Sequence, residues 1–80
     1  MDEREQKVKG IISKIIKVPV DKLENDDDLV DKHGMDSLAR VEIVTELEKA
    51  FDIMIEDDEA IKLRTVNLCL QLVDKQMSKK

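Results

Sequence analysis

The segment Gly34-Met35-Asp36-Ser37-Leu38 contains the residue whose type and position best suit chemistry. Ser37 directly follows Asp36, a residue type favoured at the N-cap of a helix, so the serine is expected in the first turn of that helix. A helix N-terminus attracts anions, and a phosphate ester on Ser37 would be stabilised there. Gly34 gives another protein room to approach. Serine and aspartate are also common as simple caps, so these residues alone leave open whether Ser37 is a site or a cap.

Other groups of residues are weaker candidates for a catalytic or metal-binding site. His33 is the only histidine, and a Ser-His-Asp site would need it beside Ser37, with an oxyanion hole and an enclosed cleft. A chain of 80 residues offers little enclosure, so we predict that the protein is not an enzyme. The run Asn25-Asp26-Asp27-Asp28 lacks the glycine and glutamate of a calcium loop, so these acids are expected to be solvated and no metal site is predicted. Cys69, the only cysteine, is expected in the core.

An amphipathic helix is predicted near the start of the chain. Five apolar residues with helical spacing would form one face: Val8, Ile11, Ile12, Ile15 and Ile16. Asp2 suits the N-cap with Glu5 in capping-box position, and Pro19 ends the helix near Lys17. A long loop is then expected from about residue 20 to residue 35. Four apolar anchors would hold it: Val20, Leu23, Leu29 and Val30.

Further helices are predicted after this loop. The one that begins after Asp36 would bury a stripe made of Leu38, Val41, Val44, Leu47 and Phe51. A short helix is expected from about Asp58 to Leu63, and Thr65 is expected to cap a last helix. The inner face of that last helix would hold Val66, Cys69, Leu70, Val73 and Met77. The core should include Ile12, Ile15, Leu47, Phe51, Val66 and Val73. The sequence thus predicts an all-α domain over residues 1–80, a small bundle of three main helices and one short helix, with a long first loop.

Composition and charge narrow the class of protein. Phe51 is the only aromatic residue, and two glycines and one proline are too few for a β-rich fold. The net charge is −5, which argues against nucleic acid and anionic membranes as partners. Residues 36–60 hold nine acids against Arg40 and Lys49, so a basic partner would dock there. The charged first ten residues are unlike a signal peptide, and we expect a cytoplasmic monomer.

The pattern as a whole resembles the acyl carrier protein family. Asp36-Ser37-Leu38, preceded by Gly34 and followed by Val41-Glu42, is similar to the attachment motif of these carriers. The first helix, the long loop, the acidic second helix and Thr65-Val66 at the start of the last helix occur in the expected order. Lys32-His33 and Arg40 depart from the common pattern, and they leave open which pathway such a carrier would serve.

The resemblance implies a role for Ser37 and its neighbours. Ser37 would receive 4'-phosphopantetheine from coenzyme A through a separate phosphopantetheinyl transferase, and only that enzyme needs Mg²⁺. Asp36 and Leu38 would flank the attachment point. Acyl groups would be held as thioesters for partner enzymes of fatty acid, polyketide or related biosynthesis. An unmodified acidic helical interaction domain is the alternative.

The resemblance also implies a docking surface, and the sequence suggests a site for the acyl chain. Four acids would meet basic patches on the transferase and on acyl-processing enzymes: Glu42, Glu46, Glu48 and Asp57. The chain, if sheltered, would lie between the second helix and the short third one. Six residues would line that pocket and fill the core when no chain is carried: Val41, Leu47, Met54, Ile55, Ala60 and Ile61.

Overall fold

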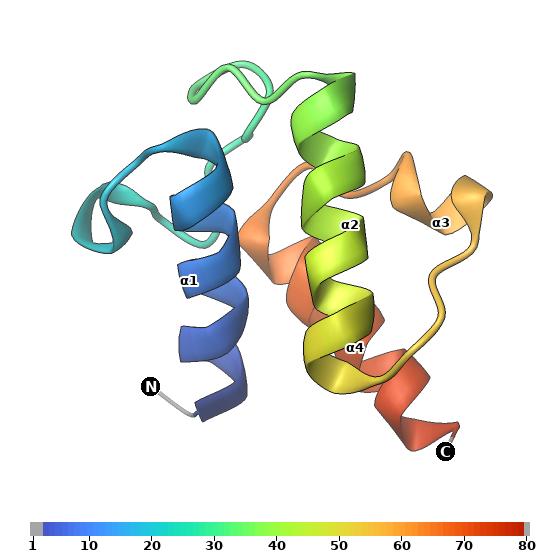
Figure 1. The fold of residues 1–80 in the computed structure, drawn as a ribbon. Helices are drawn as coiled ribbons and strands as arrows, with labels where there is room; N and C mark the ends of the chain where they lie inside the picture. Colours follow the sequence, from blue (N-terminus) through green and yellow to red (C-terminus); the bar gives the residue numbers. More distant parts are fainter. Residues whose placement is uncertain (1–2, 80) are drawn as a thin grey trace.

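Helices make up the secondary structure of residues 3–79, the part of the chain that the computed structural model describes (Figure 1). In chain order they are α1 (Glu3–Ile16), the 3₁₀ turn η1 (Val20–Lys22), α2 (Ser37–Phe51), α3 (Asp57–Ala60) and α4 (Val66–Ser78). Within the described range there is no strand, and the predicted all-α class is confirmed. The short helix is a single turn that starts one residue before the predicted Asp58 and ends before Leu63.

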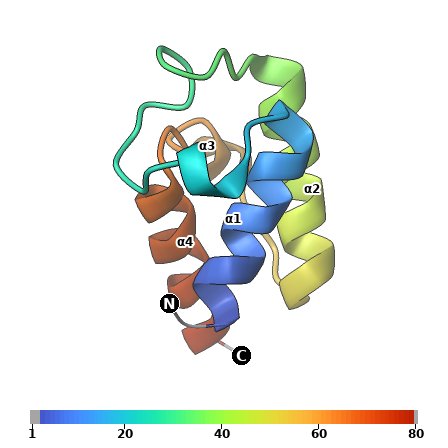
Figure 2. The same ribbon diagram turned by 90° about the vertical axis from the view of Figure 1, so that its left-hand side faces the viewer.

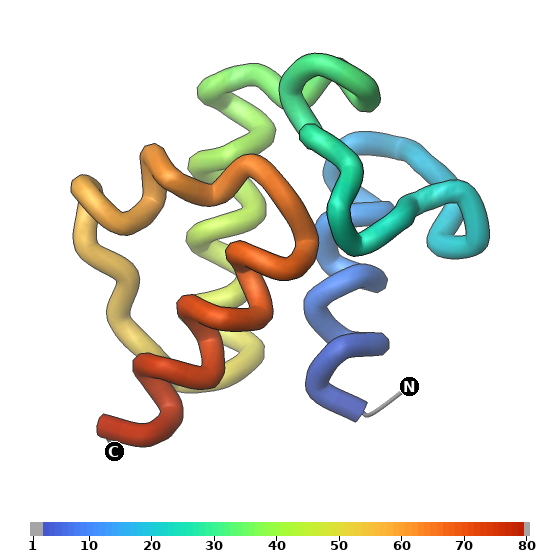
Figure 3. The backbone as a smooth tube through the Cα atoms, turned by 180° about the vertical axis from the view of Figure 1, so that it is seen from behind, coloured from blue at the N-terminus to red at the C-terminus, as the bar shows by residue number. Residues whose placement is uncertain are grey.

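The three long helices pack on one another. Helix α1 contacts both α2 and α4, while α2 contacts α4 and, on another side, the short α3. Figure 1 shows α1 and α2 running in opposite directions, and Figure 2 shows α1 in front of the other two long helices. Seen from behind in Figure 3, the loop between α1 and α2 lies beside the segment that leads into α4. None of the helices in residues 3–79 is long and apolar enough to cross a membrane.

Helix α1 forms where its apolar spacing predicts it. Val8 and Ile12 are completely buried, and Ile11, Ile15 and Ile16 pack against the core at its edge. The helix ends as predicted, where Lys17 takes a left-handed conformation with φ 62° before Pro19. The predicted N-cap Asp2 lies outside the described residues.

The inner face of α2 differs from the predicted stripe. Leu38 and Val41 are 68% and 60% exposed, whereas Ile43 and Leu47 are buried. Two apolar stripes overlap on this helix, one through Leu38 and Val41 and one through Ile43, Leu47 and the half-buried Phe51. Spacing alone cannot choose between them, because the choice depends on where α1 and α4 lie.

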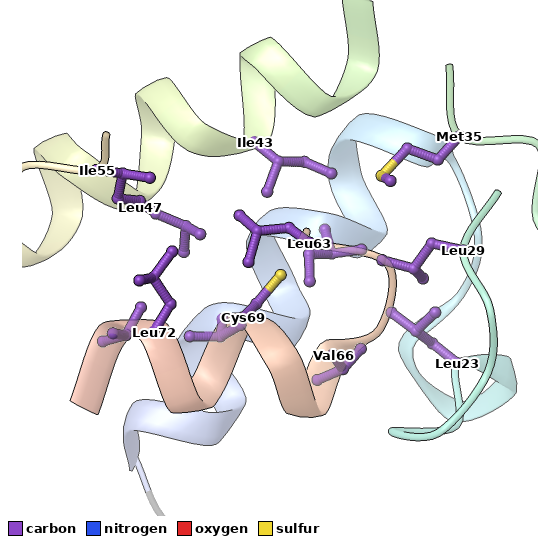
Figure 4. Close-up of a cluster of buried hydrophobic side chains, with 13 residues drawn as sticks. Leu23, Leu29, Met35, Ile43, Leu47, Ile55, Leu63, Val66, Cys69 and Leu72 are labelled. Atoms are coloured by element: carbon purple, nitrogen blue, oxygen red, sulfur yellow. The ribbon is translucent and has the colours of Figure 1, made fainter. Parts of the chain in front are cut away.

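The core is built of aliphatic side chains from all the long helices and the loops. Figure 4 shows Ile43 and Leu47 directed from α2 toward Cys69 and Leu72 of α4, with Leu23, Leu29 and Met35 of the long loop at one end. Of the six residues predicted to share one core, four are fully buried and two, Ile15 and Phe51, lie at its edge. Cys69 is 1% exposed and is a core residue as predicted, and this burial raises the pKa of its thiol to about 12.

Candidate functional site

Ser37 is the first residue of α2, and its side chain is exposed. The helix is capped by its neighbour: an Asp36 carboxylate oxygen accepts a hydrogen bond from the backbone N–H of Ala39 at 2.8 Å. Within residues 3–79 the Ser37 hydroxyl makes no hydrogen bond to another residue. The reading of Ser37 as a simple cap is therefore wrong, and its oxygen is available for modification.

The start of α2 suits a phosphate ester. The first turn of the helix contains no acidic residue. Apart from the capping Asp36, no carboxylate there offsets the positive end of the helix dipole or occupies the free backbone N–H groups. A phosphodiester on the exposed Ser37 oxygen would lie close to these donors. The residues present thus fit a phosphorylated prosthetic group.

A tight turn directs the chain into Asp36. The backbone N–H groups of Gly34 and Met35 donate to the carbonyls of Val30 and Leu29 at 3.2 and 2.9 Å. Gly34 has φ 69°, a conformation that favours glycine. Met35 is buried, and this apolar anchor was missed in the sequence because a single methionine beside a glycine carries no periodic signal. The turn fixes the direction from which the chain enters α2.

The acids of the long loop hold it together, so the expectation that they are merely solvated is wrong. The Asp28 carboxylate accepts from the backbone N–H groups of Val30 and Asp31 at 2.9 and 3.0 Å. The Arg64 guanidinium donates to the same carboxylate at 2.8 Å. The backbone N–H of Asp31 and then Arg64 hold the pKa of Asp28 below its usual value. Asp26 accepts a hydrogen bond from the Asn67 side chain.

His33 is occupied by the same loop. Its Nε2 lies 2.9 Å from a carboxylate oxygen of Asp27, and both side chains are only about a tenth exposed. Lys32 adds a second contact to Asp27 at 3.1 Å. These partners, His33 first, lower the pKa of Asp27. His33 is therefore engaged in positioning the loop and makes no hydrogen bond to Ser37.

The four predicted docking acids fall into two groups. Glu42 and Glu46 on α2 and Asp57 on α3 are exposed. Glu48 is half-buried, and its carboxylate accepts a hydrogen bond from the backbone N–H of Ile55 at 2.9 Å. Glu48 thus holds the segment between α2 and α3 in place, whatever else it contacts.

The six predicted pocket residues are not gathered in the core. Leu47 and Ile55 are buried and Ala60 is half-buried, but Val41, Met54 and Ile61 are 60%, 72% and 65% exposed. The expectation that all six fill the core of the unloaded protein is wrong for these three. Val41 lines an open groove beside α1, and the single turn of α3 is too short to cover Met54 and Ile61.

Two adjoining grooves run along α1 and α2, and periodicity gave no sign of them. The first, of about 430 Å³, lies beside the start of α2 and includes Asp36, Leu38 and Lys17. The second, of about 520 Å³, continues between the two helices over Gly10 and Ile11. Ile15 and Glu42 line both grooves. The one available signal was Gly10, which lies inside a helix although glycine costs about 1 kcal/mol there relative to alanine.

Comparison with known proteins agrees with this geometry. Residues 6–73 match the family model described as "Phosphopantetheine attachment site". The chain is 38% identical to the acyl carrier protein of Buchnera aphidicola subsp. Schizaphis graminum (strain Sg) over 79 residues, which cover 99% of this chain and 100% of that relative. The chain belongs to the acyl carrier protein family.

A second relative supports the assignment to this family. The acyl carrier protein of Desulforapulum autotrophicum is 44% identical over 73 residues, which cover 90% of this chain and 95% of that protein. Members of the acyl carrier protein family carry their cargo and are not enzymes, and phosphopantetheine is the group that the matched model describes. The predictions of family, cofactor and absence of catalysis are therefore confirmed.

Proposed function

We propose that Ser37 is the attachment point of the phosphopantetheine arm, on which the chain holds acyl intermediates as thioesters and delivers them to enzymes of fatty acid, polyketide or related biosynthesis. One observation carries the proposal: Asp36 caps α2 while the neighbouring Ser37 side chain stays exposed. If Ser37 served only to cap α2, Asp36 would not already accept the capping hydrogen bond.

The residues around Ser37 have separate tasks in this function. Asp36 fixes the first turn of α2 through its hydrogen bond to Ala39, which holds the Ser37 oxygen at a constant place for the transferase. The free backbone amides of that turn stabilise the phosphodiester once it is formed. The transferase supplies the base and the Mg²⁺. When bound, the arm supplies a terminal thiol that carries the acyl group.

Exposed side chains of α2 and α3 support docking to basic partners. Glu42, Glu46 and Asp57 give this surface negative charge, and Leu38 and Val41 add exposed apolar area. A charged rim around an apolar contact speeds and orients a transient encounter without making it tight. We propose the transferase and acyl-processing enzymes with basic patches as the partners of this surface.

A mass spectrum tests the attachment. Incubation with coenzyme A and a promiscuous phosphopantetheinyl transferase should add one arm to the wild type and to Ser78→Ala, and none to Ser37→Ala. Ser78 is a fair control because it is an exposed serine near the end of another helix. An arm on Ser37→Ala would move the site elsewhere. No arm on any variant would favour the alternative, an unmodified acidic interaction domain.

The acyl chain has a candidate site in the predicted pocket between α2 and α3, which would open by moving the buried Leu47 and Ile55.

A further inference from the structure

Arg40 lies one turn beyond Ser37 on α2, and it differs from the other two arginines of the chain. Arg4 and Arg64 each pair with an aspartate. The half-buried side chain of Arg40 makes no ion pair and no hydrogen bond within residues 3–79, and its Nε atom is buried without an acceptor. A buried donor without an acceptor is unfavourable. Arg40 therefore gains free energy from any acceptor that comes within its reach.

The acid best placed to pair with Arg40 is already occupied. Asp36 lies four residues before Arg40, a spacing at which opposite charges meet across one helical turn. The Asp36 carboxylate instead caps the helix through the backbone N–H of Ala39. The backbone N–H of Arg40 donates to the Asp36 carbonyl at 3.0 Å, so the two residues do stand one above the other. The guanidinium thus stays without an acid in the described part of the chain.

Helix geometry places the Arg40 side chain beside Ser37. Residues three positions apart lie on one face of a helix, with their Cβ atoms about 5–6 Å apart. Long side chains on a helix lean toward its N-terminus, so that of Arg40 leans over the turn that begins at Ser37. On the other side of Arg40 the helix carries the buried Ile43 and Leu47. A long stem beside such a stripe is partly covered, which accounts for the buried Nε.

We propose that the guanidinium of Arg40 binds the phosphodiester that joins the arm to Ser37. This inference rests on the proposed attachment at Ser37. The phosphodiester is bonded directly to the serine oxygen, so it lies within reach of a residue one turn away, whereas the thiol is at the far end of the arm. Arginine binds phosphate through two parallel N–H···O bonds. Because no hydrogen bond holds the guanidinium in its present place, it can turn toward the phosphate without losing one.

The charge of Arg40 also suits the surroundings of this phosphodiester. The exposed carboxylate of Asp36 directly precedes Ser37, and its negative charge repels that of the phosphodiester. The guanidinium, one turn away, offsets this repulsion and adds to the attraction of the helix N-terminus. The first section of the arm is then held against α2, and only the rest of it swings.

Phosphorus NMR tests the contact. Wild type, Arg40→Gln, Arg40→Lys and Lys49→Gln are each modified with coenzyme A and the transferase, and mass spectrometry confirms loading. The phosphodiester signal of the folded wild type should differ from that of the same protein unfolded in urea. Arg40→Gln should reduce this difference about twofold or more, because the bidentate contact is lost. Arg40→Lys should restore part of it, because an ammonium still binds phosphate as a point charge.

A matched control separates a contact from the general charge of the helix. Lys49→Gln removes one positive charge from the last turn of α2, so it changes the net charge as Arg40→Gln does. It should leave the phosphodiester signal as in the wild type. Circular dichroism of each variant confirms that it is folded.

A second measurement uses the wild type alone. The Nε–H signal of Arg40 in nitrogen-edited spectra should shift when the arm is added. The corresponding signals of Arg4 and Arg64 should stay in place, because these two residues are already paired with aspartates. This measurement does not depend on the folding of any variant.

The outcomes distinguish this inference from the attachment. Failure to load the wild type would overturn the proposed function and the inference with it. Loading with the same phosphorus signal in wild type and Arg40→Gln, or with an unmoved Nε–H signal of Arg40, would overturn the inference alone. An equal loss in Lys49→Gln would show that the overall charge of α2 moves the signal, and would overturn the inference as well.

Discussion

The guanidinium of Arg64 lies 2.8 Å from the carboxylate of Asp28 and so joins the segment before α4 to the loop before α2. The backbone repeats this link, because the N–H of Leu29 donates to the Arg64 carbonyl at 2.7 Å. Two segments far apart in the sequence thus hold each other, and the chain runs on from one of them to Ser37, the proposed attachment residue.

This pair predicts an acid-sensitive loop. The pKa of Asp28 is lowered from its usual 3.8, so its contribution to stability is present above that value and is lost as the pH falls through the lower pKa of the folded state. Asp28→Asn should therefore lower the urea midpoint at neutral pH, and its difference from the wild type should shrink below about pH 4. Urea unfolding at several pH values measures this. Asp21→Asn, at an exposed acid of η1, should leave the urea midpoint unchanged at every pH. A decrease of the midpoint as large as that of Asp28→Asn would contradict the prediction.

The two glycines should respond to alanine in opposite directions. Gly34 has φ 69°, so Gly34→Ala should lower the free energy of unfolding by about 1–2 kcal/mol through backbone strain alone. Gly10 lies in a regular helix with free space above it, so Gly10→Ala should raise it by about 0.5–1 kcal/mol. Chemical denaturation measures both, and a destabilised Gly10→Ala would show that its surroundings are tighter than described.

Leu47 should matter more to stability than the only aromatic residue. Leu47 is completely buried, and Leu47→Ala should cost about 3–4 kcal/mol. Phe51 lies at the core's edge, with the Lys7 ammonium 5.6 Å from the ring centre, so Phe51→Ala should cost only about 2 kcal/mol. If calorimetry or urea unfolding gave the reverse order, the packing of the last turn of α2 would be misassigned.

Charge reversal on α2 should slow docking. Replacing Glu42 and Glu46 by lysine should reduce the rate of modification by the transferase about tenfold at low salt, and less at high salt, because the attraction is screened. Stopped-flow or early-time mass spectrometry measures the rate. Asp21→Lys reverses one charge away from α2 and should have little effect, and each of the single variants Glu42→Lys and Glu46→Lys should slow modification more than it does. Glu48→Ala should instead lower stability, because it removes the oxygen that accepts a hydrogen bond from the backbone N–H of Ile55.

Local chemistry made parts of this molecule predictable. Asp36 and Thr65 cap their helices through hydrogen bonds to residues three positions ahead, and such bonds depend on neighbours in the sequence alone. The apolar stripe of α1 was predictable too, because its spacing is read from one continuous segment of the sequence. The inner face of α2 was not predictable. Leu38 and Ile43 are both apolar, and only the packing of α2 against the other helices leaves Leu38 exposed and buries Ile43. The pairing of His33 with Asp27 and the groove over Gly10 likewise depend on how separate segments meet.

The links between residues 25–29 and 64–67 also bear on when the protein becomes ready for use. The backbone N–H of Asn67 donates to the Asn25 carbonyl, so the loop before Ser37 lacks these links to the start of α4 until that part of the chain has been synthesised. A chain on the ribosome grows from its N-terminus, and Ser37 would emerge well before those links can form. The ordered presentation of the serine then waits for the start of α4, and an incomplete chain would offer the transferase a poorly positioned target.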